Sequence, residues 1–134
     1  FKRKTGLKLV SFPFSTREMD SDDEKIYESG PADFISMIKN ATLVITDSFH
    51  ATAFSINMKT PFFSLLRQKN SDKRSMNSRL YSILSLCKLS HRLITPESKR
   101  FPDDVFTIDF SEAELFLRKK RQEDLDYLKK TLEY

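Results

Sequence analysis

Three polar residues that could do chemistry follow an apolar segment in TLVITDSFHATAF, residues 42–54: Asp47, Ser48 and His50. Serine is a preferred residue for capping a helix N-terminus, so we expect Phe49 and His50 in a first helical turn. The unpaired backbone N–H groups and the positive dipole end of such a turn favour an anion. A histidine adds a hydrogen bond or a proton near neutral pH. The pattern predicts a phosphate or carboxylate site to which His50 contributes a donor.

Spacing alone leaves a second interpretation open, in which Asp47 and Ser48 only cap the helix and His50 is a surface residue or a satisfied core residue. Other kinds of site are not indicated. The chain has only two glycines, so neither a dinucleotide fingerprint nor a P-loop can be drawn. His50 and His91 are far apart and Cys87 is the only cysteine, which gives no metal-binding cluster. We therefore expect no metal and no cofactor.

Length and composition fit one folded domain. The 134 residues allow a real hydrophobic core, and the twelve Phe residues supply bulky material for it. No apolar segment is long enough to span a membrane, and the single cysteine fits a reducing, cytoplasmic compartment, with a peripheral position at the inner membrane face as a variant. The first residue is Phe1 and no signal peptide is visible, so we expect a fragment.

The elements that must position the site alternate between strands and helices. We predict strands over 7–14, 42–48 and 61–67, with helices starting after Gly30 and within 51–59. The segment 42–48 is β-branched and apolar, which predicts a central strand buried on both faces, and 15–25 is expected to be an acidic loop. Such alternation with short connections favours an α/β, Rossmann-like three-layer domain with a mostly parallel sheet.

The second half of the chain continues this order. A helix is predicted over 75–88, and its apolar stripe includes Cys87 as a buried residue. HRLIT (91–95) and VFTID (105–109) are further short strand candidates. Ser111 and Glu114 form a capping-box pattern for a closing helix, whose predicted buried stripe is made of Leu125, Leu128 and Leu132.

Basic residues cluster after the 61–67 segment. If all strands are parallel, this cluster lies at the same sheet edge as the His50 turn, where it could contact an anion; a plain basic surface loop is the alternative. The candidate anion contacts are Arg67, Lys69 and Arg74. No aromatic residues are interleaved with them as in nucleic-acid-binding modules, so a nucleic-acid partner is not expected.

Two blocks of the sequence resemble the polysaccharide pyruvyl transferase family. PADFISMIKNATLVITDSFHATAFSINMKTPFF (31–63) is similar to its hallmark segment, with a helix, a hydrophobic strand, a Ser-x-His turn and a following helix and strand. NSRLYSILSLCKLSHR (77–92) resembles the family's next segment, in which an arginine precedes a Leu-rich helix and a short basic strand. The two blocks cover a little over a third of the chain, in the family's order.

The resemblance implies a two-domain enzyme laid out like GT-B glycosyltransferases, with this chain as a single C-terminal donor-binding domain and an N-terminal domain missing. It implies transfer of enolpyruvyl from phosphoenolpyruvate to two hydroxyls of a saccharide acceptor, as a pyruvate ketal, in bacterial cell-surface polysaccharide synthesis. His50 matches the family's donor-site histidine, Ser48 and Phe49 match the turn beside it, and Arg79 matches the arginine of the second block.

One position departs from the family pattern, because Ala51 stands where the family commonly has glycine. A methyl group there could crowd a ligand that approaches the backbone. Two other functions therefore stay open: a GT-B-like glycosyltransferase that uses a nucleotide-sugar, and a non-catalytic Rossmann-like interaction module.

Overall fold

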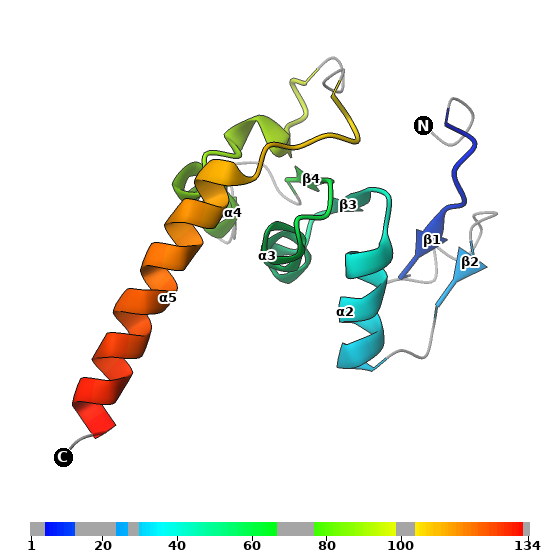
Figure 1. The fold of residues 1–134 in the computed structure, drawn as a ribbon. Coiled ribbons are helices and arrows are strands. Elements are labelled where there is room, and N and C mark those ends of the chain that lie inside the picture. The colour runs from blue at the N-terminus through cyan, green and yellow to red at the C-terminus, as the bar shows by residue number, and fades with distance from the viewer. Residues whose placement is uncertain (1–4, 13–23, 27–29, 67–76, 99–103, 133–134) are drawn as a thin grey trace. The chain divides into compact units, whose positions relative to one another are not determined.

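The computed structural model describes residues 5–12, 24–26, 30–66, 77–98 and 104–132 (Figure 1). The chain divides into two compact units, residues 1–35 and residues 36–134, and each is described by itself. That both belong to a single domain stays a prediction.

The first unit contains a short parallel strand pair. β1 (Val10–Ser11) pairs with β2 (Glu24–Lys25), and Val10 lies opposite Glu24. The expected strand over 7–14 is therefore much shorter in its described part. The expected loop over 15–25 is wrong at its end, because the last two of its residues form β2. Most of that loop lies outside the described residues.

The helix α2 (Pro31–Asn40) begins where the sequence predicts. The backbone N–H of Gly30 donates to the carboxylate of Asp33 at 2.9 Å, which closes the first turn. Proline suits this position because its missing N–H would have no intrahelical partner. Farther along the helix, Ile38 is buried.

A three-stranded parallel sheet forms the centre of the second unit. Its strands are β3 (Val44–Thr46), β4 (Phe62–Leu65) and β5 (Leu93–Ile94), in the order β3-β4-β5. The expectation that 42–48 is the central strand is wrong for this sheet, since β4 lies in the middle. Three of the four β4 residues are buried, whereas Ile45 of β3 is 41% exposed.

Three helices accompany the sheet: α3 (Phe49–Met58), α4 (Asn77–Leu86) and α5 (Ser111–Leu132). A short 3₁₀ helix, η2 (Ser90–Arg92), leads into β5. The buried core joins all three helices to the sheet and consists of Ile56, Phe62, Leu84, Cys87, Leu89, Phe110 and Ala113. Burying a side chain such as that of Phe62 contributes about 1.5–3 kcal/mol. This is the predicted α/β class, compatible with a Rossmann-like three-layer fold, and the predicted burial of Cys87 is confirmed.

The segment before α5 differs from the prediction. Residues 105–109 form no strand. Instead, the buried Arg92 donates to the carbonyl of Thr107 within this segment, and to the carbonyl and the carboxylate of Asp104 directly before it. The Arg92 side chain is fully buried and its guanidinium carbon lies 5.1 Å from the centroid of the Phe63 ring. An arginine at the end of η2, directly before β5, thus holds a loop that begins twelve residues later.

The helix α5 also departs from its predicted contacts. The N–H of Ser111 donates to the carboxylate of Asp109 at 2.9 Å, so Ser111 is the first residue of the helix and not its cap. Glu114 pairs with Lys59 and so forms no capping box. Figure 1 shows the C-terminal turns of α5 extending away from the sheet of its own unit. The predicted buried stripe is therefore wrong: Leu125, Leu128 and Leu132 are 50%, 51% and 79% exposed. Among the described residues, no helix is long and apolar enough to cross a membrane.

Candidate functional site

The turn after β3 has the predicted cap. Ser48 has an extended backbone (φ −87°, ψ 127°), and its hydroxyl accepts the N–H of Ala51 at 3.4 Å. The N–H of Ser48 in turn donates to the hydroxyl of Thr46, the last residue of β3, at 3.0 Å. The serine cap is confirmed, and Phe49 and His50 occupy the first turn of α3.

A buried pair of hydroxyls supports this turn from inside the protein. Thr52 donates from its hydroxyl to the carbonyl of Ser48 at 3.0 Å, and the same oxygen lies 2.8 Å from the hydroxyl of Ser64. Both Thr52 and Ser64 are completely buried. The cap is therefore tied to the middle strand β4, which restricts movement of the turn. Sequence reasoning missed this pair, although a polar residue four positions after a cap, on the helix face toward the sheet, is a usable signal.

The structure brings together three of the predicted site residues, which come from two separate segments. The guanidinium carbon of Arg79 lies 5.2 Å from the centroid of the Phe49 ring. The ring of His50 contacts the same Phe49 ring, with centroids 5.8 Å apart and an angle of 78° between the planes. Because Arg79 is the third residue of α4, the first turns of α3 and α4 meet at Phe49.

The charges around this meeting point favour an anion. Neither first turn contains an acidic residue, and both helices direct the positive ends of their dipoles here. The side chains of His50 and Arg79 are exposed, while Phe49 is half-buried. An exposed imidazole and an exposed guanidinium beside two helix N-termini can contact a ligand with two negative groups. Asp47 is exposed and lies before the cap, outside the helix.

The departure at Ala51 has little steric effect on this surface. Ala51 is only 4% exposed, so its methyl group packs inside the protein and not beside the exposed imidazole of His50. The anion contacts predicted at Arg67, Lys69 and Arg74 lie outside the described residues, and their role stays a prediction.

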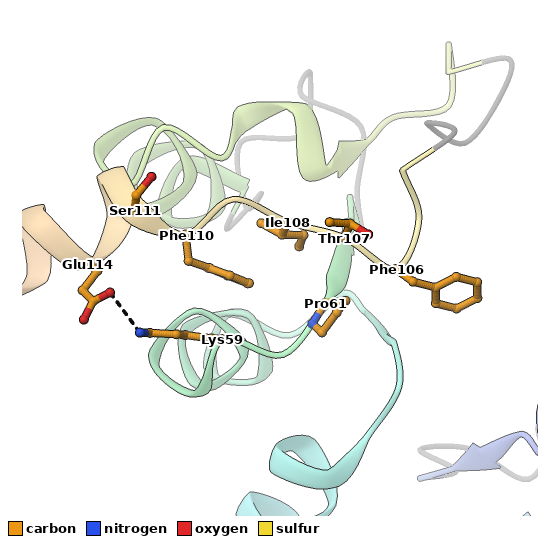
Figure 2. A pocket seen from close by; sticks show the side chains of 8 residues that line it. All are labelled: Lys59, Pro61, Phe106, Thr107, Ile108, Phe110, Ser111 and Glu114. Carbon is orange, nitrogen blue, oxygen red and sulfur yellow. Dashed lines mark hydrogen bonds and ion pairs between the residues drawn. The ribbon is translucent and has the colours of Figure 1, made fainter.

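A surface pocket of about 440 Å³ lies elsewhere on the second unit (Figure 2). It is lined by Lys59, Pro61, Phe106, Thr107, Ile108, Phe110, Ser111 and Glu114. Figure 2 shows the Lys59–Glu114 ion pair at one end, with an N–O distance of 2.9 Å, and Phe106 at the other. Lys59 and Pro61 precede β4, whereas His50 follows the carboxyl end of β3. The pocket therefore lies at the amino ends of the parallel strands, opposite the carboxyl ends where His50 lies. The other histidine, His91, is exposed on η2, and the described residues contain no group of three or more metal-ligating side chains.

Comparison with known proteins places the chain in a family. The sequence profile described as polysaccharide pyruvyl transferase matches residues 2–69, half of the chain, and includes the Ser48–His50 turn but not Arg79. No curated protein and no solved structure matches the chain. The matched half carries the capped turn and His50, and by this match the chain belongs to the polysaccharide pyruvyl transferase family.

Proposed function

We propose that this chain is the donor-binding part of a polysaccharide pyruvyl transferase-like enzyme, and that it binds phosphoenolpyruvate at the Ser48–His50 turn. The observation that carries the proposal is the meeting of His50 and Arg79 at the Phe49 ring, where two helices begin. Phosphoenolpyruvate carries a phosphate and a carboxylate, and both need cations and N–H donors. The two first turns offer both kinds of group.

The proposed chemistry begins with proton transfer to the methylene carbon of phosphoenolpyruvate. Protonation makes the neighbouring carbon electrophilic, and a sugar hydroxyl then adds to it and loses its proton. Cleavage of the C–O bond to phosphate releases inorganic phosphate, and a second hydroxyl adds to the same carbon and loses its proton, which closes the pyruvate ketal. His50 is the proposed acid, Arg79 the proposed anion ligand, and Ser48 and Phe49 shape the turn. No residue of the described segments is assigned as the base for the hydroxyls.

The partners follow from this reaction. A saccharide supplies the two hydroxyls, and an N-terminal domain of the same protein supplies the acceptor site. We therefore expect these 134 residues alone to bind the donor without turning it over. A cytoplasmic enzyme, peripheral at the inner membrane face, would meet both substrates there.

Calorimetric titration of phosphoenolpyruvate into the chain tests the proposal, with inorganic phosphate and a nucleotide-sugar as comparators. The variants are His50→Ala and Arg79→Ala. The matched controls are His91→Ala, which removes the other exposed histidine, and Arg118→Ala, which removes an exposed arginine from α5. Each site variant should weaken phosphoenolpyruvate binding at least tenfold, which corresponds to about 1.4 kcal/mol, whereas the controls should bind like the wild type.

Two results would redirect the proposal. Preference for the nucleotide-sugar would indicate a glycosyltransferase. Absence of binding by any of the three ligands, with a folded chain, would leave an interaction module as the better interpretation.

A further inference from the structure

Phe49 contacts both of the charged or titratable side chains of the candidate site. Its ring contacts the guanidinium of Arg79, 5.2 Å away, and the imidazole of His50, 5.8 Å away. Phe49 is half-buried, although both of its neighbours are exposed. Phe49 is the first residue of α3, directly after the Ser48 cap, so the hydrogen bonds of the turn fix its backbone.

An exposed arginine at a helix start has many rotamers, and most of them would not present its guanidinium to a ligand near His50. The face of an aromatic ring attracts a guanidinium and so selects among those rotamers. A guanidinium that lies over a ring face has its N–H groups around its edge, a geometry that suits bidentate contact with a carboxylate or a phosphate. A half-buried ring is a better support for this purpose than an exposed one, because its own side chain moves less.

We propose that Phe49 is a positioning residue, whose ring orients the Arg79 guanidinium toward the anion bound beside His50. The inference rests on the proposed function, in which Arg79 binds the donor. It separates the roles within the turn: Ser48 fixes the backbone, Phe49 orients a cation from the neighbouring helix, and His50 and Arg79 contact the ligand.

The test compares two substitutions at Phe49. Phe49→Leu keeps an apolar side chain but removes the ring, and Phe49→Tyr keeps the ring. Titration of phosphoenolpyruvate should show about threefold to thirtyfold weaker binding by Phe49→Leu, the range expected for one cation–π contact. Phe49→Tyr should bind within about twofold of the wild type by the same reasoning. In an Arg79→Ala background, Phe49→Leu should have no further effect, since the residue on which the ring acts is gone.

A second measurement tests the contact between Arg79 and Phe49 without any ligand. In the wild type, NMR should show the Arg79 side-chain protons shifted upfield by the ring of Phe49. That shift should disappear in Phe49→Leu and persist in Phe49→Tyr. Far-UV circular dichroism and thermal unfolding of each variant verify that the chain is folded.

The outcomes separate the inference from the proposed function. Equal weakening by Phe49→Leu with and without Arg79, or unchanged binding by a folded Phe49→Leu, would overturn the positioning role while leaving the donor site in place. Absence of phosphoenolpyruvate binding by the wild type would overturn the proposed function and, with it, the donor-directed role of Phe49. In that case the NMR shift still decides whether the ring holds Arg79.

Discussion

Replacing Asp104 by asparagine should destabilise the protein more than its exposure suggests. The Asp104 side chain is 56% exposed, but its carboxylate accepts a hydrogen bond from the fully buried guanidinium of Arg92 at 2.7 Å. Within the described residues, Nε and Nη1 of Arg92 have no hydrogen-bond partner. Burial lowers the pKa of Arg92, and the charge of Asp104 opposes that lowering. Asparagine keeps the size and an acceptor oxygen but removes the counter-charge.

The expected cost follows from the geometry of this pair. Two unit charges about 4 Å apart interact by about 4 kcal/mol at an effective dielectric constant of about 20. Solvent around the exposed part of Asp104 screens the interaction, so we expect about 1–2 kcal/mol. Arg92→Met removes the buried cation as well as its hydrogen bonds. In that background, Asp104→Asn should therefore cost less than about 0.5 kcal/mol, the usual range for a surface substitution.

Urea unfolding of the wild type, Asp104→Asn, Arg92→Met and the double variant measures the cost of Asp104→Asn with and without the buried cation. The chain has no tryptophan, so Cys87 is a convenient probe: it is 1% exposed in the core of the second unit, and its alkylation reports the unfolding of that unit. Asp124→Asn, a change of the same chemistry on the exposed surface of α5, is the control. An Asp104→Asn cost that equals the control, or that persists unchanged in the Arg92→Met background, would refute the view that a buried cation depends on this carboxylate.

Three further predictions concern other contacts. The hydrogen bond and charge of Lys59 lower the pKa of Glu114. The stability that this pair contributes is therefore present above the ordinary Glu pKa of 4.5 and is lost as pH falls through the lowered pKa. The difference in urea midpoint between the wild type and Lys59→Met should accordingly shrink from about pH 7 to about pH 3. Thr52→Val should cost about 1–3 kcal/mol in urea unfolding, because it leaves the buried hydroxyl of Ser64 without its partner, and a second change to Ser64→Ala should recover part of that loss. Leu128→Gln should change stability by less than about 0.5 kcal/mol, since Leu128 is half-exposed on α5; a loss of several kcal/mol would mean that the stripe is covered after all.

The local part of the site could be predicted from the sequence. A serine before an aromatic residue and a histidine, directly after a β-branched segment, indicated a capped helix start, and the cap at Ser48 has the expected geometry. The contact between Phe49 and Arg79 could not be predicted in this way. It depends on how α3 and α4 pack, and Arg79 entered the candidate site only through resemblance to a family.

The wrong predictions about the fold have a common cause. The residue pattern of a segment does not show which other part of the protein packs against it. The segment 105–109 has strand-like residues, but its Thr107 carbonyl accepts a hydrogen bond from Arg92, as does the carbonyl of Asp104 just before the segment. The leucines at 125, 128 and 132 have the spacing of one helix face, but spacing does not supply a partner, and they are exposed. The segment 42–48 is as apolar as a central strand, yet β4 occupies the middle of the sheet.

The two faces of β4 connect these features in different ways. Ser64 points toward α3 and bonds to Thr52, which supports the Ser48 turn. Phe63 directly precedes Ser64 in the strand, so its side chain points to the opposite face, where it contacts Arg92. Because neighbouring residues of one strand serve the candidate site and the Arg92 contacts separately, changes at Arg92 should reduce stability without altering the turn that carries His50. Changes at Thr52, by contrast, act on the turn directly, so a loss of donor binding in a folded Thr52 variant, with binding intact in a folded Arg92 variant, is the pattern that this arrangement requires.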